Sequence, residues 1–169
     1  LLALLLGDVT GGAATTRFFC VYRSSLADPL TYLRLFTHVL GHVGYSHYMG
    51  NMLLLLLVGP PLEEKYGSRT LLLTIAVTAL VTGLVQFIFF PQTALLGASG
   101  VVFMMIVLSS FTEMKKGGIP ITLILVVVFY LGGELVDGLK NTDNISQLTH
   151  IVGGACGMVF GFTLRSRKR

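Results

Sequence analysis

The sequence predicts an all-α membrane protein, a polytopic bundle of six transmembrane helices whose first helix is largely missing or truncated. Three observations support this fold class. Of the 169 residues, 53% are hydrophobic and 12% are charged, whereas a soluble domain carries roughly 25% charged residues. The mean hydropathy is +0.79. Apolar runs of membrane-spanning length recur between short polar turns, and neither a repeat nor a second domain interrupts residues 1–169.

The first apolar run is too short to cross a bilayer. Residues 1–6 rise only about 9 Å as a helix, against a hydrocarbon core of about 30 Å. We interpret them as the surviving end of a first transmembrane helix, with a signal-peptide remnant as the alternative. Residues 7–45 are too long for a structureless loop, and Leu33, Phe36 and Leu40 share one helical face. This pattern predicts short helices lying in the membrane interface, with an ordinary capping loop as the alternative.

The remaining apolar runs predict five transmembrane helices, at residues 44–62, 71–90, 99–114, 119–136 and 148–164. Pro60 and Pro61 predict a kink near the end of the first of these helices, and the polar segment 63–69 predicts the turn after it. The helix at 99–114 is short because residues 96–98 descend as non-helical backbone. Such backbone is tolerated at membrane depth only where protein or a water-filled cavity surrounds it.

The basic residues predict the orientation of the chain in the bilayer. The net charge is +4, and the cations stand at the ends of apolar runs, most densely in residues 165–169. This distribution predicts a lipid-facing anchor and argues against nucleic acid as a partner. Eight cations fall on one side and four on the other, which places the carboxyl terminus in the cytoplasm. Cys20 and Cys156 are expected at different depths, so we predict no structural disulfide.

Three polar residues from three predicted helices arrive at nearly one depth. Each height is measured from the polar inner end of the helix at about 1.5 Å per residue. Ser99 lies about 21 Å, His150 about 22 Å and His47 about 24 Å above the inner face of the membrane. Asn51 lies one helical turn closer to the inner face, on the same helix as His47. This level lies beneath the outer surface of a core about 30 Å thick. The sequence therefore predicts a polar site built inside the membrane.

The residue types at that level suit peptide hydrolysis by a serine nucleophile. Ser99 begins a helix between Gly97 and Gly100, where free N–H groups and the helix dipole favour negative charge. His150 is the candidate general base. No carboxylate lies near His150 in sequence. We interpret Glu134 and Asp137, at the outer end of the helix 119–136, as residues at the solvated mouth of the site. A two-residue dyad is therefore predicted in place of a triad.

The other histidines and Asn51 complete the candidate site. His47 and Asn51 are four residues apart, so they share a helix face and can both donate hydrogen bonds to an oxyanion. His38 and His42 share a face as well, but no carboxylate or cysteine accompanies them. We therefore expect structural hydrogen bonding from them and no metal. Two structural alternatives are that Asn51 forms a hydrogen bond between helices and that Ser99 is a helix cap.

A glycine strip predicts how the two catalytic helices meet. Gly153, Gly157 and Gly161 follow His150 at intervals of four, a spacing that permits close helix approach. The helix that begins at Ser99 is the expected partner, because that contact brings Ser99 within reach of His150. Glu63, near Arg69, is interpreted as part of a structural polar network at the cytoplasmic end.

Taken in order, these motifs resemble the rhomboid intramembrane serine proteases from Tyr32 onward. The segment 36–42 followed by His47-Tyr48-Met49-Gly50-Asn51 resembles the first-loop and H-x-x-x-N pattern of that family. Residues 59–67, with Glu63 among them, resemble its G-x-x-x-E-x-x-x-G. Residues 97–100 resemble its G-x-S-G nucleophile motif, and residues 150–157 its H-x-x-G-x-x-x-G.

The resemblance implies Ser99 as nucleophile and His150 as base, with His47, Asn51 and the Ser99 backbone amide stabilising the oxyanion. It also implies a half-submerged first loop anchored by Arg34 and gating of substrates near the helix 119–136. Two positions depart from the family pattern. Leu33-Arg34 stands where the family has Trp-Arg, and Phe103 stands where a tyrosine commonly stacks on the catalytic histidine.

We therefore expect a cofactor-free serine endopeptidase that cleaves transmembrane or juxtamembrane segments of other membrane proteins. The small chain without further domains favours a bacterial inner membrane. Two other functions remain open. One is a non-catalytic member of the same architecture that binds membrane proteins. The other is a transporter or channel lined by His47, Asn51 and His150, against which stands the lack of paired half-helices.

Overall fold

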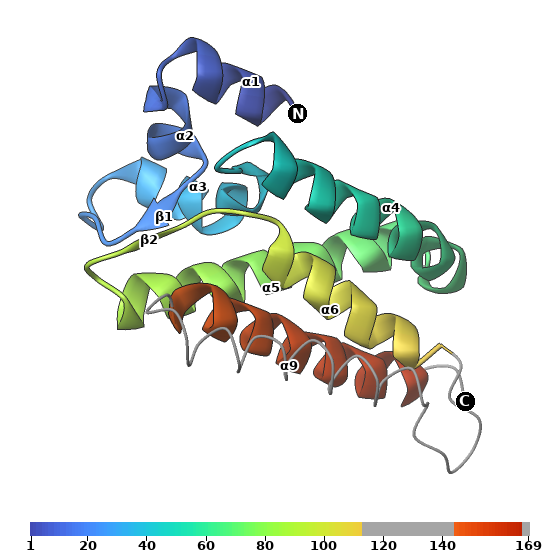
Figure 1. Cartoon of the computed structure of the whole chain (residues 1–169). Coiled ribbons are helices and arrows are strands. Elements are labelled where there is room, and N and C mark those ends of the chain that lie inside the picture. Colours follow the sequence, from blue (N-terminus) through green and yellow to red (C-terminus); the bar gives the residue numbers. More distant parts are fainter. Residues whose placement is uncertain (113–143, 167–169) are drawn as a thin grey trace.

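The computed structural model describes residues 1–112 and 144–166, and this part of the chain is mostly helical. Four long helices lie side by side: α4 (Tyr45–Tyr66), α5 (Ser68–Phe89), α6 (Ser99–Ser110) and α9 (Asn144–Ser166). In Figure 1 α6 lies between α4 and α9, with α5 behind them. Because α6 is enclosed on several sides, its side chains form the core, and Val101, Met104 and Leu108 are buried. The helical fold class is confirmed.

The segment 7–45 contains the short helices that its apolar character predicts. They are α2 (Ala13–Phe18), α3 (Pro29–Thr37) and the 3-10 helix η1 (His38–Leu40), preceded by α1 (Leu2–Val9). The structure also contains a pair of two-residue strands that the sequence does not predict, β1 (Val21–Tyr22) and β2 (Ala94–Leu95). They pair antiparallel, with Val21 opposite Leu95. This pairing ties the amino-terminal segment to the chain that leads into α6 (Figure 1).

Helix α3 exposes apolar side chains on its outer face and buries Arg34 together with Leu35 on the face turned to the protein. Leu33 and Phe36 are 43% and 44% exposed, whereas Arg34 is 2% exposed. The Arg34 guanidinium donates to Asp28 Oδ2 at 2.9 Å and to Tyr22 Oη at 3.0 Å. An apolar outer face over a buried arginine is the arrangement that suits a helix at a membrane interface. It fits the anchoring role that the resemblance implies for Arg34.

Several predicted boundaries are wrong. Helix α4 continues through Pro60 and Pro61 to Tyr66, where the sequence predicts a polar turn from residue 63. Neighbouring helices in a membrane bundle make such prolines tolerable. The turn is Gly67 alone, whose φ of +81° favours glycine. Helix α6 ends at Ser110 instead of 114, and α9 begins at Asn144 instead of 148. The predicted helix 119–136 lies outside the described residues.

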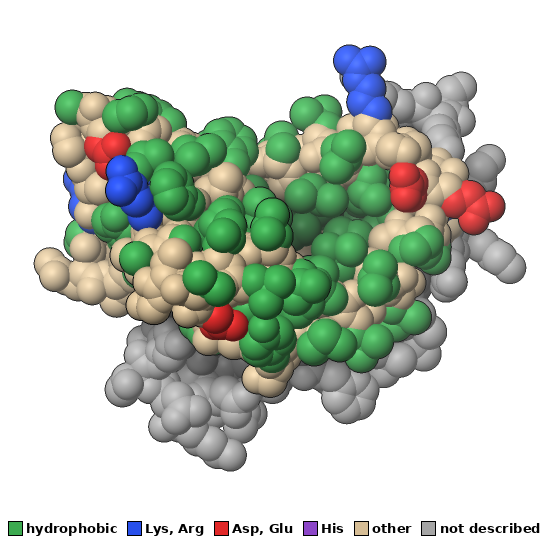
Figure 2. All heavy atoms as spheres, turned by 90° about the horizontal axis from the view of Figure 1, so that it is seen from above, with side chains coloured by type: hydrophobic (Ala, Val, Ile, Leu, Met, Phe, Trp, Pro, Cys, Tyr) green, Lys and Arg blue, Asp and Glu red, His purple; other side chains and the backbone are tan. Residues whose placement is uncertain are grey.

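The described surface is that of a membrane-type helical protein. Helix α5 is the one helix of the described ranges that is long and apolar enough to cross a membrane, with a mean hydropathy of 2.3. On α4, Leu53, Leu56 and Leu57 are all exposed. Figure 2 shows one face covered mostly by hydrophobic side chains, with few charged ones. The number of membrane spans and the orientation of the chain stay predictions.

Candidate active site

The turn before α6 sets the position of Ser99. Gly97 has a φ of +129°, a backbone conformation that L side chains rarely adopt, and its N–H donates to the His38 carbonyl oxygen at 2.9 Å. Ser99 follows as the first residue of α6 and is half-buried. N–H groups in the first turn of a helix have no intrahelical acceptor, and the helix dipole is positive there. The Ser99 turn therefore offers a hydroxyl beside backbone donors.

His150 lies on α9 beside this turn and is 7% exposed. The glycine strip brings α9 against α6 as its spacing predicts. A Cβ added at Gly153 would overlap the Gly100 carbonyl oxygen, and one added at Gly157 would lie 2.5 Å from the Met104 carbonyl oxygen. The Phe103 ring packs on the His150 imidazole at a centroid distance of 6.1 Å and a tilt of 44°. Phe103 thus lies beside His150, where the resemblance implies an aromatic ring.

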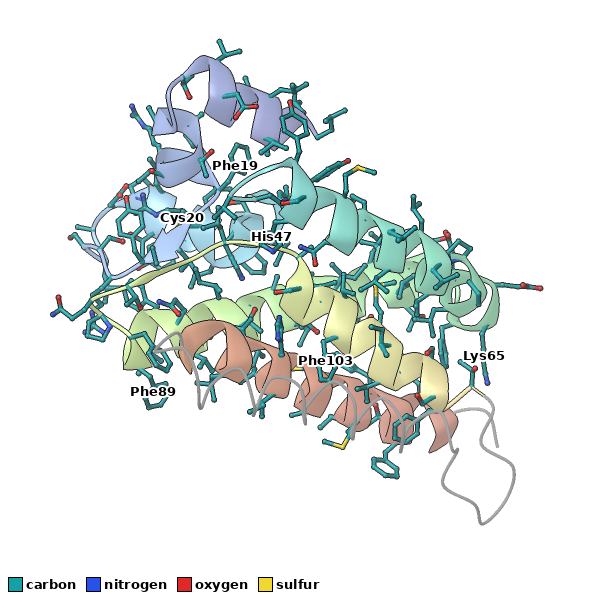
Figure 3. The ribbon with its side chains drawn as sticks, viewed as in Figure 1. Phe19, Cys20, His47, Lys65, Phe89 and Phe103 are labelled. Atoms are coloured by element: carbon teal, nitrogen blue, oxygen red, sulfur yellow. The ribbon has the colours of Figure 1, made fainter. Side chains whose placement is uncertain are left out.

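His47 and Asn51 reach the same place from the start of α4. The His47 ring lies over Gly97, because a Cβ added there would lie 2.8 Å from His47 Cε1 (Figure 3). Asn51 is buried. Within the described part of the chain, His47 Nδ1 and Asn51 Nδ2 contact no hydrogen-bond partner. Donors of this kind, buried beside a serine hydroxyl, are what an oxyanion would require.

A cavity of about 340 Å³ brings these four residues together. Ser99 comes from α6, His150 from α9, and His47 and Asn51 from α4. The remaining walls are formed by Ser46, Gly50, Leu54, Leu95 and Leu96. The structure therefore places the predicted residues of three helices around one space. Leu95 of β2 and the following Leu96 are lining residues that the sequence does not indicate.

His38 has a structural position beneath this site. Its Nδ1 lies 3.2 Å from the Arg34 carbonyl oxygen and its Nε2 lies 3.3 Å from Thr82 Oγ1 on α5. Burial lowers the pKa of His38 to about 4, so it is neutral at physiological pH. Because its own carbonyl holds Gly97, His38 connects α3, α5 and the Ser99 turn. Thr82 was not singled out from sequence, and only its place in a row of α5 polar residues could have indicated it.

Two further predictions concern metal binding and Glu63. No cluster of three or more metal-ligating side chains occurs within residues 1–112 and 144–166. Glu63 accepts a hydrogen bond from Ser68 Oγ at 2.5 Å, so its described partner is this hydroxyl and not Arg69. The Lys65 ammonium donates to the Thr112 carbonyl, which joins the ends of α4 and α6. Glu63 and Lys65 thus take part in polar contacts at one end of the bundle, far along α4 from His47.

Comparisons with known proteins find similarity over most of the chain. A family model described as Rhomboid domain matches residues 29–167. Rhomboid-related protein 2 of Mus musculus is 30% identical over 162 residues, covering 83% of this chain and 53% of that protein. Rhomboid-related protein 1 of Caenorhabditis elegans is 31% identical over 134 residues, and the match covers 73% of this chain and 37% of that protein. Rhomboid protease GluP of Bacillus subtilis is 27% identical over 162 residues, and the match covers 91% of this chain and 31% of that protein. The chain spans about half or less of each relative's length.

Proposed function

Because this chain belongs to the rhomboid family, we propose that it is an intramembrane serine endopeptidase that uses a Ser99–His150 dyad. The observation that carries the proposal is the cavity shared by Ser99, His150, His47 and Asn51. A nucleophile, a base and oxyanion donors are the parts that acyl transfer needs. The relative named Rhomboid protease GluP supports the same chemistry. No cofactor enters the proposed reaction.

The first half of the reaction forms an acyl-enzyme. Ser99 Oγ attacks the carbonyl carbon of the scissile peptide while its proton passes to His150. The negative charge that develops on the carbonyl oxygen is met by the Ser99 backbone N–H and by His47 and Asn51. His150 then gives the proton to the leaving amine as the C–N bond breaks. An ester between Ser99 and the amino-terminal part of the substrate remains.

The second half of the reaction consumes one water molecule. Water adds to the ester carbon as His150 accepts one of its protons, and the same donors again stabilise the oxyanion. The ester C–O bond then breaks and Ser99 Oγ takes the proton back from His150. The products are a carboxylic acid and the restored hydroxyl.

The proposal extends to the membrane setting. Residues 1–169 form one protease domain with the membrane-spanning helices predicted from the sequence and the end of a truncated first helix, and the carboxyl terminus lies in the cytoplasm. The substrates are transmembrane or juxtamembrane segments of other proteins, which must unwind before their peptide bonds are accessible. Segments rich in glycine and proline should be preferred, because these residues disfavour helix. A bacterial inner membrane is the proposed location.

The test is cleavage of a generic transmembrane substrate by the purified protein in detergent, compared with Ser99→Ala and His150→Ala. We expect both variants to lose cleavage and Ser99→Ala to lose labelling by a fluorophosphonate. Labelling that persists in Ser99→Ala would refute the assignment. Substrate binding that survives both substitutions, with no cleavage by the parent, would instead favour a non-catalytic binder of membrane proteins.

A further inference from the structure

A second cavity adjoins the proposed active site. It has a volume of about 440 Å³, and most of its lining residues come from the helical hairpin of α1 and α2, so we call it the hairpin cavity. Leu96 is a wall of both this cavity and the Ser99 cavity. His42 is another wall, and its Nδ1 lies 3.3 Å from the Leu40 carbonyl oxygen, the structural hydrogen bond expected of it. Burial lowers the pKa of His42, so this ring adds no positive charge to the cavity.

Asp8 gives the hairpin cavity a carboxylate that has no cation beside it. This residue lines the cavity from the last turn of α1 and is exposed. Within residues 1–112 and 144–166, the one ion pair joins Arg34 to Asp28. Arg17, the other charged residue of the hairpin, lies over the Phe18 ring at 5.6 Å from its centroid. In the part of the chain that the structure describes, Asp8 therefore has no charged partner.

The neutral groups around Asp8 leave its carboxylate able to accept further hydrogen bonds. The Tyr45 hydroxyl, at the start of α4, is its hydrogen-bond partner. A carboxylate offers about four acceptor positions, so one donor does not fill it. On α2, the Thr16 hydroxyl donates to the Gly12 carbonyl oxygen at 3.2 Å, and its own oxygen can still accept. The hairpin cavity thus offers acceptors and a negative charge, within the range of roughly 300–1,000 Å³ that is typical of ligand sites.

The position of Asp8 brings this charge close to a bound substrate. Its partner Tyr45 precedes Ser46, which lines the Ser99 cavity. Leu96 is a second link, because it lines both spaces. An extended peptide advances about 3.3 Å per residue, so a chain whose scissile bond lies at Ser99 can reach the hairpin cavity within a few residues. A side chain of that part of the substrate would then contact Asp8.

We propose that the hairpin cavity is a substrate subsite in which Asp8 binds a basic side chain, arginine in preference to lysine, a few residues from the scissile bond. This inference rests on the proposed function and names the substrates that it favours, membrane proteins with a basic residue beside the cleaved segment. A guanidinium suits the subsite because its planar N–H groups can pair with a carboxylate and still reach a hydroxyl. Asp8 is thus a specificity-determining residue that takes no part in the bonds that break.

The experiment places Arg, Gln or Glu in turn at successive positions on both sides of the cleaved bond of a transmembrane substrate. Because Gln is polar and uncharged, the ratio of kcat/KM for Arg over Gln isolates the effect of the charge. At the positions that enter the hairpin cavity, we expect Arg to be favoured about fivefold, the factor given by a partly screened ion pair. Asp8→Asn should cleave the Arg and Gln substrates equally, and Asp8→Lys should favour Glu. Added NaCl should lower the preference of the parent.

Two control variants separate recognition from an effect on the fold. Glu64→Gln removes an exposed carboxylate near the other end of α4 and should leave the Arg preference unchanged. Tyr45→Phe removes the hydrogen bond between α4 and Asp8 but keeps the carboxylate, so the preference should persist. A variant that merely disturbs the fold slows all substrates alike and leaves the ratio as it was.

The outcomes distinguish this inference from the proposed function. A parent that cleaves Arg and Gln substrates equally at every position, or an Arg preference that Asp8→Asn retains, would overturn the subsite and leave the proposed protease intact. If the parent cleaves no substrate, the proposed function fails and this inference fails with it.

Discussion

The contact between Gly153 and Gly100 gives the sharpest test of the site, because it fixes the separation of α9 from α6. A Cβ at Gly153 would overlap the Gly100 carbonyl oxygen and lie 2.9 Å from its carbonyl carbon. Carbon atoms pack at about 3.5–4.0 Å, so Gly153→Ala must move the helices apart by about 1 Å. A misplacement of that size between reacting groups costs roughly a hundredfold in rate. We expect this loss in kcat for a transmembrane substrate, because His150 is on one helix and Ser99 on the other.

The matched control is Gly59→Ala, a glycine inside α4. Its added Cβ would lie 3.4 Å from the flexible end of Met105, an ordinary contact, so activity should stay within about twofold of the parent and stability should rise by up to about 1 kcal/mol. Circular dichroism and thermal unfolding in detergent check that both variants are folded. A folded Gly153→Ala protein with the parent kcat would refute the idea that this contact sets the distance between Ser99 and His150.

Three further predictions concern residues around the Ser99 turn. Gly97→Ala places a Cβ 2.8 Å from His47 Cε1 at a φ of +129°, so we expect kcat to fall by roughly a hundredfold with little change in KM, measured by steady-state cleavage. Neutral His38 stabilises the folded protein fully above pH 6.5. Because its folded pKa is about 4, that contribution falls by roughly 3 kcal/mol as the pH drops towards 4. The unfolding free energies of the parent and of His38→Gln, measured across this pH range, should therefore converge at low pH. Arg34→Met removes the guanidinium bonds to Tyr22 and Ser24 and should lower the unfolding free energy by about 2 kcal/mol in the same assay. An unchanged stability would contradict the anchoring role of Arg34.

Sequence reasoning reached the site because its chemistry depends on residue type and helical spacing. The interval of four between His47 and Asn51 and the strip beginning at Gly153 are local patterns, and both determine a helix face directly. The pairing of Val21 with Leu95 could not be predicted in this way, since two residues carry no periodic signal and their partner lies far along the chain. The end of α4 was misplaced because Pro60 and Pro61 normally interrupt helices, and the packing that overrides this tendency is not visible in sequence.

The Ser99 turn is held mainly by the interfacial segment, and this has a functional consequence. Gly97 donates to the His38 carbonyl, and β2, which leads into the turn, pairs with β1. Helix α3 in turn packs closely on α5, since a Cβ at Gly83 would lie 2.8 Å from the Leu35 carbonyl oxygen. The outward face of α3 is apolar and meets the membrane interface in the proposed setting. A segment that is embedded on one side and bonded to the nucleophile turn on the other can pre-organise Ser99 without any contact from the substrate.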